Sequence, residues 1–193
     1  MSFVIITGGI GTGKSTVLAA FAQLGAHCLD TDEVAHALYA PDGPAYQLIA
    51  EHFGKEVLLQ DGSLNRKAIA DRVFRHPAEL AWLNGLLHPM IRERMQTEAE
   101  RVAPEPLFVA VPLWYESGWK LPNVRVVATW CTDEQQKQRL HKRGWDDAEI
   151  ERRIKAQLPK DDKLNRADYG VLTIGSLELL QEQCRRIYGQ LTK

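Results

Sequence analysis

The chain has 193 residues, 45% of them hydrophobic and 25% charged, with a formal net charge of −1 at pH 7. This composition is typical of a globular domain, and the small net charge provides no general positive field for nucleic acid or an anionic membrane, so any bound anion must be held by local groups. No segment approaches the roughly 18 apolar residues that span a bilayer and no secretion signal is evident, so we expect a cytoplasmic protein without a membrane partner. We also expect no nucleic-acid partner, and a monomer or a small homo-oligomer.

The N-terminal segment predicts a phosphate-binding loop. Residues 3–7 are a predicted β-strand, residues 8–13 a glycine-rich turn, and a helix is predicted over 15–24, ended by Gly25. Glycines let backbone N–H groups approach an anion, and the helix start adds the positive end of its dipole. Lys14 would reach the outer phosphates and Ser15 would offer a hydroxyl to Mg²⁺. The candidate nucleotide-binding residues here are Gly9, Gly11, Thr12, Gly13, Lys14, Ser15 and Thr16.

The apolar runs of the chain predict an α/β fold with a parallel sheet. Continuous apolarity is typical of strands that are covered on both faces, and helical patterns lie between and after these runs. The last helix is predicted over 176–191. The five predicted strands, each expected to be fully buried, are residues 3–7, 27–29, 107–111, 124–130 and 169–173.

Two aspartates, Asp30 and Asp32, follow the second predicted strand, at the sheet edge where ligands bind in open α/β folds. If the chain stays extended there, both carboxylates point the same way. One could accept a proton from a substrate hydroxyl while the other orders Mg²⁺ through water. The alternative is that Asp32 only caps the next helix. Because the strand over 107–111 ends without an acid, metal support is expected from Asp30 or Asp32, and no guanine-reading Asn-Lys-x-Asp run is present, which favours adenine.

Residues 33–106 predict a helical insertion, far longer than an ordinary crossover between strands. Asn65 is expected to cap a helix that runs through Phe74, and a helix over 78–87 is expected to end at His88-Pro89, where another begins. This insertion is expected to hold the second substrate, unless it only buttresses the core.

Residues 134–168 predict a second helical insertion, rich in charge. Arg139 and Arg143 are four residues apart and are expected to share a helix face, Asp146 is expected to start the next helix, and Leu158-Pro159 to end it. We interpret the segment as a lid that closes on nucleotide phosphates, with a solvated charged helix as the alternative.

The three cysteines, Cys28, Cys131 and Cys184, are widely separated. They form no disulfide framework or zinc-ligand pattern. We expect buried, reduced thiols that pack as small apolar groups.

These motifs together resemble the dephospho-coenzyme A kinase family over nearly the whole chain. The resemblance rests on residues 7–16, on residues 29–32 and on the Leu87-His88-Pro89 element. It implies Asp32 as general base, Lys14 and Arg139 as phosphate-stabilising cations and Ser15 as magnesium ligand. It also implies Arg143 and Thr173 in the nucleotide site. The residues implied near the acceptor are Asp30, Arg66, His88 and Glu116.

One departure from the family concerns Thr173, which stands where the family usually has an asparagine near the adenine. Threonine offers a hydroxyl but not the paired donor and acceptor of an amide, so adenine selectivity is expected to be looser.

The resemblance implies an α/β P-loop kinase that uses ATP and Mg²⁺ to phosphorylate the ribose 3′-hydroxyl of dephospho-coenzyme A, giving coenzyme A and ADP. The nucleotide-binding core would comprise residues 1–32, 107–133 and 169–193, the helical acceptor domain residues 33–106, and the lid residues 134–168. Another P-loop nucleoside or nucleotide kinase and a non-catalytic nucleotide-binding protein remain alternatives.

Overall fold

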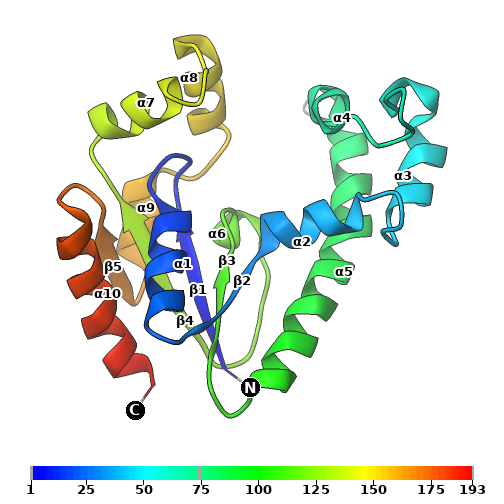
Figure 1. The fold of residues 1–193 in the computed structure, drawn as a ribbon. Coiled ribbons are helices and arrows are strands. Elements are labelled where there is room, and N and C mark those ends of the chain that lie inside the picture. The colour runs from blue at the N-terminus through cyan, green and yellow to red at the C-terminus, as the bar shows by residue number, and fades with distance from the viewer. Residues whose placement is uncertain (1, 74, 193) are drawn as a thin grey trace. The chain divides into compact units, whose positions relative to one another are not determined.

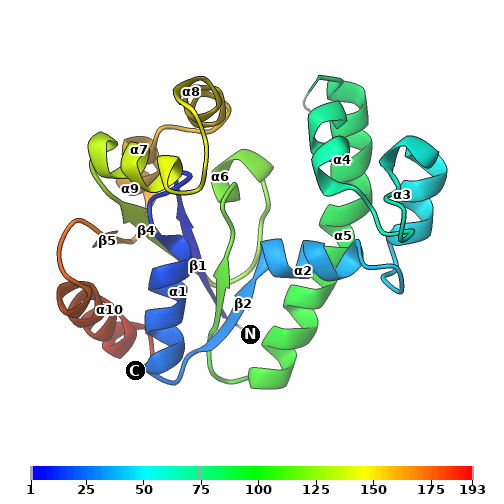
Figure 2. The same cartoon turned by 45° about the horizontal axis from the view of Figure 1, so that its top comes forward.

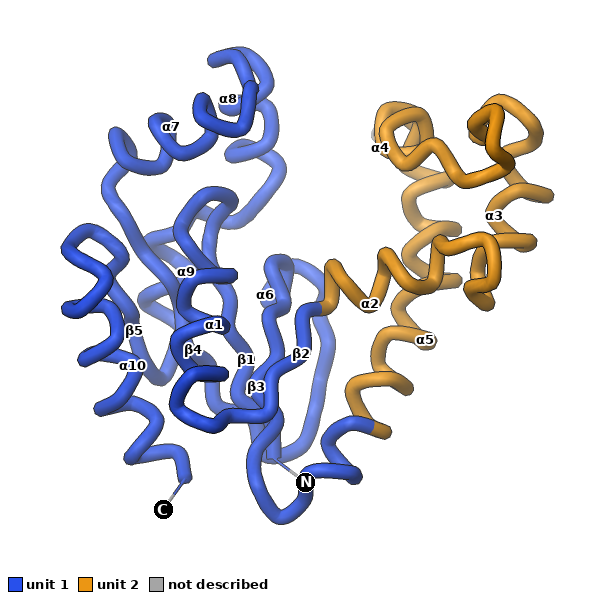
Figure 3. The backbone as a smooth tube through the Cα atoms, viewed as in Figure 1, with its two compact units in different colours: residues 1–30, 98–193 blue, residues 31–97 orange. Residues whose placement is uncertain are grey.

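The computed structural model describes residues 2–73 and 75–192 and divides into two compact units (Figure 3). Unit 1 comprises residues 1–30 and 98–193, and unit 2 comprises residues 31–97. The long helix α5 (Pro77–Val102) crosses the boundary between them.

Unit 1 contains a five-stranded, all-parallel sheet in the order β2-β3-β1-β4-β5 (Figure 1). Phe3 of the central strand pairs in register with Leu107 on one side and with Val124 on the other. The predicted α/β class with a five-stranded parallel sheet is confirmed, and every predicted strand ends within one residue of the observed one. The strands are β1 (Phe3–Gly8), β2 (His27–Asp30), β3 (Leu107–Ala110), β4 (Val124–Trp130) and β5 (Tyr169–Leu172).

The prediction that all five strands are fully buried is wrong for β2, β4 and β5. Every residue of β1 and β3 is buried, whereas β4 is buried only over residues 126–129, β2 has no buried residue and β5 has only Val171. For β2 and β5 the reason is their position, because they are the edges of the sheet. Edge strands pair on one side only, so apolar sequence alone does not distinguish them from central strands.

Helices α1 (Lys14–Gln23) and α10 (Leu177–Leu191) contribute to the same core as β1 (Figures 1 and 2). The rings of Phe21 in α1 and Phe108 in β3 lie 4.8 Å apart between their centroids. This packing fixes α1 directly after the central strand and therefore fixes the loop that joins them. The buried residues of this core are Val4, Ile6, Val17, Ala20, Phe21, Phe108, Val127, Val171, Leu180, Cys184 and Ile187.

The charged segment after β4 folds into α7 (Asp133–His141), α8 (Asp147–Lys155) and α9 (Lys160–Arg166), and α9 contacts β4 and β1. The predicted start of α8 is confirmed, since the Asp146 carboxylate accepts a 2.8 Å hydrogen bond from the Glu149 N–H. The prediction that Arg139 and Arg143 share a helix face is wrong, because α7 ends at His141. A short helix, α6 (Trp114–Ser117), follows β3.

Unit 2 is helical, as predicted for the first insertion. The predicted cap at Asn65 is confirmed, because its side-chain oxygen accepts a 3.1 Å hydrogen bond from the Ala68 N–H. The predicted helix end at Phe74 lies outside the described residues. Its elements before α5 are α2 (Thr31–Leu38), α3 (Tyr46–Phe53), the 3₁₀ helix η1 (Lys55–Val57) and α4 (Arg66–Val73).

Helix α5 continues through His88-Pro89, so the helix boundary predicted there is wrong. Pro89 has no N–H to donate to the Gly85 carbonyl, and a proline ring also crowds that carbonyl. Burial of an apolar stripe on both sides of the proline outweighs the lost hydrogen bond. The stripe consists of Leu83, Leu87, Ile91, Met95 and Ala99.

The cysteines are unpaired, as predicted, but Cys28 is only partly buried. Burial raises the pKa of the Cys28 and Cys184 thiols to about 11, which leaves both thiols protonated and poorly nucleophilic. Within the part of the chain that the structure describes, no helix has the length and apolarity to cross a membrane.

Candidate active site

The loop between β1 and α1 has the backbone geometry of an anion cradle. Gly11 and Gly13 have φ angles of +76° and +94°, which residues with a Cβ rarely adopt. A Cβ on Gly11 would also lie 3.0 Å from Leu140, and one on Gly13 would lie 3.2 Å from Thr173. These glycines are therefore required both by the turn and by the packing of α7 and the segment after β5 against it.

The carbonyl groups of this loop are bound by donors from the protein itself. In a trans peptide the N–H points away from the preceding carbonyl, so the Gly11 N–H points away from Gln136 and the Gly13 N–H points away from Thr173. Both N–H groups lie next to the start of α1, where the positive end of the helix dipole favours an anion. The acceptor–donor pairs are Gly9 O with Lys14 Nζ at 3.0 Å, Ile10 O with Gln136 Nε2 at 2.6 Å, Gly11 O with Arg139 Nη1 at 3.4 Å, and Thr12 O with Thr173 Oγ1 at 2.9 Å.

Lys14 folds back over the loop, with its Nζ 3.1 Å from the Gly8 oxygen and 3.0 Å from the Gly9 oxygen. The ammonium group is thus held next to the cradle. Ser15 and Thr16, in the first turn of α1, are exposed. Thr12 is fully buried, and its hydroxyl bonds to Gly9 O and to the Thr129 hydroxyl, each at 2.7 Å, so its side chain supports the loop from behind.

A cavity of about 470 Å³ opens beside the loop, between α7 and the start of α10. Arg139, Lys142 and Arg143 provide positive charge, while Leu177 and Leu180 provide apolar surface. Positive groups suit phosphates, and apolar surface suits the flat face of a base. The structure brings the predicted catalytic cation Arg139 to this cavity, together with most of the predicted nucleotide-binding residues, namely Gly11, Gly13, Ser15, Thr16, Arg143 and Thr173.

Thr173 joins the cavity to the loop through a hydroxyl that is already engaged. Its Oγ1 accepts from Arg139 Nη1 at 2.9 Å and lies 2.9 Å from Thr12 O and 3.2 Å from Trp130 O. Arg139 Nη2 also donates to the Thr173 carbonyl at 2.5 Å. A hydroxyl has one hydrogen to donate, so in this arrangement Thr173 directs it into the protein.

The chain does not stay extended through Asp30 and Asp32, so that part of the prediction is wrong. β2 ends at Asp30 and α2 begins at Thr31, which places Asp32 and Glu33 in the first turn of α2. Acidic side chains at a helix start interact favourably with its dipole, which explains why the helix begins here. Thr31 is buried and Asp32 is exposed. The Asp32 side chain is therefore accessible, two residues beyond the carboxyl end of β2.

Candidate acceptor residues lie in both units. In unit 2, Arg66 begins α4 and acts electrostatically on Tyr39, whose pKa burial raises and the arginine lowers. His88 lies within α5, where burial, together with the positive charge of Arg92, lowers its pKa. In unit 1, Glu116 is held in α6 by partners described next.

Glu116 forms an ion pair with Lys163, at 2.7 Å between Oε1 and Nζ, and accepts a 2.9 Å hydrogen bond from the Leu158 N–H. Lys163 is fully buried and also donates to the Pro112 carbonyl at 2.8 Å. Burial lowers the pKa of the Lys163 ammonium, and the bond to Glu116 opposes that shift. This pair ties the segment after β3 to α9. Sequence reasoning did not find it, since nothing in a lone lysine marks it as buried.

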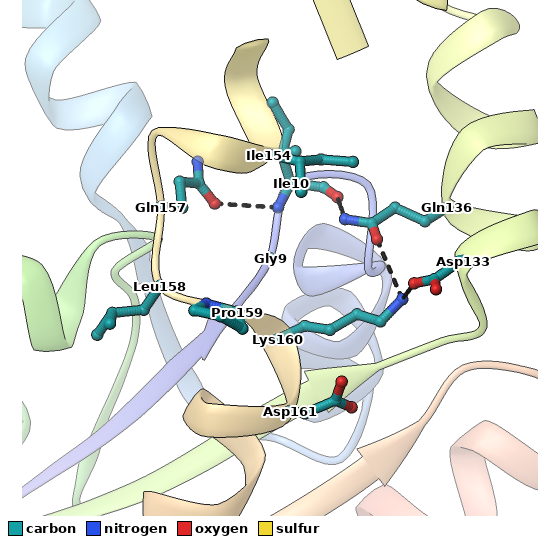
Figure 4. Close-up of a pocket in the computed structure, with 10 residues that line it drawn as sticks. All are labelled: Gly9, Ile10, Asp133, Gln136, Ile154, Gln157, Leu158, Pro159, Lys160 and Asp161. Carbon is teal, nitrogen blue, oxygen red and sulfur yellow. Dashed lines mark hydrogen bonds and ion pairs between the residues drawn. The ribbon is translucent and has the colours of Figure 1, made fainter. Parts of the chain in front are cut away.

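A smaller cavity, of about 120 Å³, is lined by Gly9 and Ile10 of the loop and by residues of the segment after β4 (Figure 4). Ile10 is held there by Gln157, whose Oε1 accepts its N–H at 3.2 Å, and by Gln136, which binds its carbonyl. Lys160 is buried, donates to Gln136 Oε1 at 3.1 Å and pairs with Asp133. The sequence did not predict that Gln136 and Gln157 hold Ile10, because neither glutamine belongs to a motif that indicates this role.

Fold and site together define a P-loop kinase, with a glycine-rich loop after the central strand of a parallel sheet and cations around the adjoining cavity. The family model for dephospho-CoA kinase matches residues 2–178. The chain therefore belongs to the dephospho-CoA kinase family, and the resemblance found in its sequence is confirmed.

Individual relatives agree with this membership. The dephospho-CoA kinase of Anaeromyxobacter dehalogenans is 40% identical over 195 residues, which cover 99% of this chain and 92% of the relative. A Thermus thermophilus crystal structure has a TM-score of 0.84 and 31% identity, covering 100% of this chain and 99% of the other. The dephospho-CoA kinase structure from Campylobacter jejuni has a TM-score of 0.69 and 22% identity, covering 98% and 96%, and supports the fold.

Proposed function

We propose that this chain transfers the terminal phosphoryl group of ATP to the ribose 3′-hydroxyl of dephospho-CoA, giving coenzyme A and ADP. Membership of the dephospho-CoA kinase family over residues 2–178 is the observation that carries the proposal. The cradle at residues 8–13 and the cationic cavity beside it supply what phosphoryl transfer needs, which is positioning and charge stabilisation.

Asp32 is the proposed general base. A carboxylate within reach of the acceptor hydroxyl would orient it and take its proton as the bond to phosphorus forms. Its exposure in the first turn of α2 supports this role, since a carboxylate committed to the protein interior could not meet a substrate.

Lys14 and Arg139 are the proposed cations that neutralise charge on the transferred group. Lys14 is already held over the loop by Gly8 O and Gly9 O. Arg139 bonds to Thr173 and to Gly11 O through three of its five N–H donors, so a phosphate contact does not require these bonds to break. Arg143 lines the same cavity and would add positive charge on the nucleotide.

Ser15 is the proposed protein ligand of Mg²⁺. Its hydroxyl is a hard oxygen donor, exposed in the helix turn that follows the cradle, which fits a metal that prefers oxygen and keeps several waters. Among the described residues no cluster of His, Cys, Asp and Glu could hold a metal by itself. Asp30 or Asp32 would act through water. When bound, Mg²⁺ would neutralise and orient the β and γ phosphates.

The proposed division of labour has a nucleotide core of residues 1–32, 107–133 and 169–193, an acceptor domain of residues 33–106 and a lid of residues 134–168. The helical content of unit 2 supports an insertion with a task of its own. Asp30, Arg66 and His88 are proposed acceptor contacts. Glu116 is a further proposed acceptor contact, and its Oε1 is paired with Lys163.

We further propose a cytoplasmic enzyme that is a monomer or small homo-oligomer and binds neither nucleic acid nor membrane. The net charge of −1 supports the absence of polyanion binding.

An acceptor screen tests the proposed reaction. Purified protein is incubated with Mg-ATP and either dephospho-CoA, nucleosides, nucleoside monophosphates or no acceptor, and ADP is measured. We expect ADP formation that depends on dephospho-CoA. ADP formation with a nucleoside or nucleoside monophosphate instead would make the chain a different nucleotide kinase, and nucleotide binding without turnover would make it a binding protein.

A further inference from the structure

The tip of the phosphate loop is held by a pair of glutamines from the segment after β4 (Figure 4). Gln157 accepts the Ile10 N–H at 3.2 Å through its side-chain oxygen, and Gln136 donates to the Ile10 carbonyl at 2.6 Å. We call these two contacts the Ile10 clamp. Gln136 comes from α7 and Gln157 from the connection between α8 and α9, so the clamp connects this segment to the loop.

Gln136 is anchored by groups that fix which of its ends faces the loop. It is 4% exposed, and its Oε1 accepts from Lys160 Nζ at 3.1 Å. Lys160 is itself paired with Asp133, as the dashed lines in Figure 4 show. Because an ammonium group only donates, Gln136 must present its NH₂ group to Ile10.

Gln157 is anchored through the backbone of its neighbour. The Leu158 N–H donates to Glu116, which is fixed by the buried Lys163. Lys163 also binds the Pro112 carbonyl, which accepts a further hydrogen bond from the Thr7 hydroxyl at 3.3 Å. The backbone next to Gln157 is thus connected, through these contacts, to Thr7 near the end of β1, where the loop starts.

The clamp determines the direction of one N–H group of the cradle. The Gly9-Ile10 peptide is bound at its oxygen by Lys14 and at its N–H by Gln157, and the Ile10-Gly11 peptide is bound at its oxygen by Gln136. With both peptide planes fixed, the Gly11 N–H points away from Gln136.

The two cavities indicate which phosphate this N–H would meet. The larger cavity is lined by Gly11, Gly13 and the apolar surface suited to a base, whereas Gly9 and Ile10 line the smaller cavity. A nucleotide whose base occupied the larger cavity, and whose phosphates followed the loop from Gly13 toward Ile10, would bring its outermost phosphate closest to the clamped tip.

We propose that Gln157 is a positioning residue that, through the Ile10 clamp, aims the loop at the terminal phosphate and so favours ATP over ADP. It acts through the backbone of Ile10 and Gly11 and not by contact with the substrate. This inference rests on the proposed function only in taking ATP as the phosphate donor. The preference for a nucleotide with a third phosphate is a property of binding and can be measured without the reaction.

The test compares the affinities of Gln157→Leu for ADP and for a non-hydrolysable ATP analogue, by calorimetry. Loss of one oriented hydrogen bond is expected to weaken analogue binding by about fivefold to tenfold and ADP binding by less than about twofold. Gln138→Leu is the control, because Gln138 is exposed on the same segment and bonds to Glu134 four residues earlier. It should leave both affinities within about twofold of the unsubstituted protein. Circular dichroism and thermal unfolding establish that each variant is folded.

If Gln157→Leu does not fold, Gln157→Ala provides the same test. It removes the acceptor for the Ile10 N–H without adding a charge, so it too should weaken the analogue more than ADP. Equal weakening of both nucleotides, greater weakening of ADP or no change would overturn the inference. Turnover with dephospho-CoA is measured in parallel. Unsubstituted protein that shows no turnover while the affinity difference appears would remove the proposed reaction and leave the clamp in place.

Discussion

At the scale of single residues, the main question is the task of Asp32. It lies at the start of α2 together with Glu33, where either carboxylate could stabilise the helix through its dipole. The two roles can be distinguished by substitution. Helix stabilisation needs a negative charge in the first turn, which either residue can provide, whereas proton transfer needs the one carboxylate that lies beside the acceptor hydroxyl.

Asp32→Asn is expected to keep ATP binding and to lower the rate of phosphoryl transfer by about 100-fold or more, the usual effect of losing a general base. Glu33→Gln is the matched control, since it makes the same charge change one position along the same turn. Steady-state turnover and equilibrium ATP binding are measured for both. Near-normal turnover of Asp32→Asn, or an equal loss in Glu33→Gln, would remove Asp32 from the role of base.

His88 gives a prediction for pH. Burial, together with Arg92, lowers the pKa of the folded state below the ordinary value of 6.5. The unfolded chain then binds the proton more readily, so this residue's contribution to stability is fully present above pH 6.5 and declines as the pH falls from there toward the folded-state pKa. Urea unfolding at several pH values should show a smaller loss of stability on acidification in His88→Gln than in the unsubstituted protein. Identical losses would contradict this interpretation.

At the scale of elements, a substitution of Pro89 tests how much a proline in the interior of α5 destabilises the helix. Pro89→Ala restores a donor for the Gly85 carbonyl and removes the ring. This gain is partly offset by the greater freedom of the unfolded chain, so unfolding free energy should rise by about 1–2 kcal/mol. Pro77→Ala is the control in the same helix, since proline is well tolerated at the first helical position, and should change stability by less than about 0.5 kcal/mol. Urea unfolding measures both, and a loss of stability in Pro89→Ala would show that the helix depends on its proline.

The Glu116–Lys163 pair tests how α9 is attached to α6. Lys163→Met leaves Glu116 without its buried partner and should lower the unfolding free energy by about 3 kcal/mol or more. The double variant Glu116→Gln/Lys163→Met removes the unpaired charge and should recover at least about 1 kcal/mol of that loss. Urea unfolding of the single and double variants measures the coupling. A double variant less stable than Lys163→Met would mean that Glu116 acts mainly through the Leu158 N–H.

At the scale of the whole molecule, the sequence predicted what local patterns specify. The glycine-rich loop, all five strands and the caps at Asn65 and Asp146 follow from residue types within a few positions of one another, and the structure contains them. The family could also be predicted from the sequence, since each of its motifs is a short contiguous segment. The assignments to Lys14, Asp32 and Arg139 remain predictions.

The predictions were wrong or incomplete where contacts between residues distant in the sequence determine the structure. Pro89 stays within a helix because the apolar stripe on both sides of it is buried. The Ile10 clamp and the Lys163 ion pair join residues more than forty positions apart, and no spacing rule reports such contacts. The edge strands were misjudged for the same reason, because strand order is a property of the assembled sheet.

The most direct measurement is analysis of the product. Purified protein is incubated with Mg-ATP and dephospho-CoA, and the product is examined by phosphorus NMR with coupling to the ribose protons. We predict a new phosphomonoester that couples to the proton at the ribose 3′ carbon, together with one ADP for each ester formed. ADP accompanied only by inorganic phosphate, or a phosphate attached elsewhere, would contradict the proposed reaction.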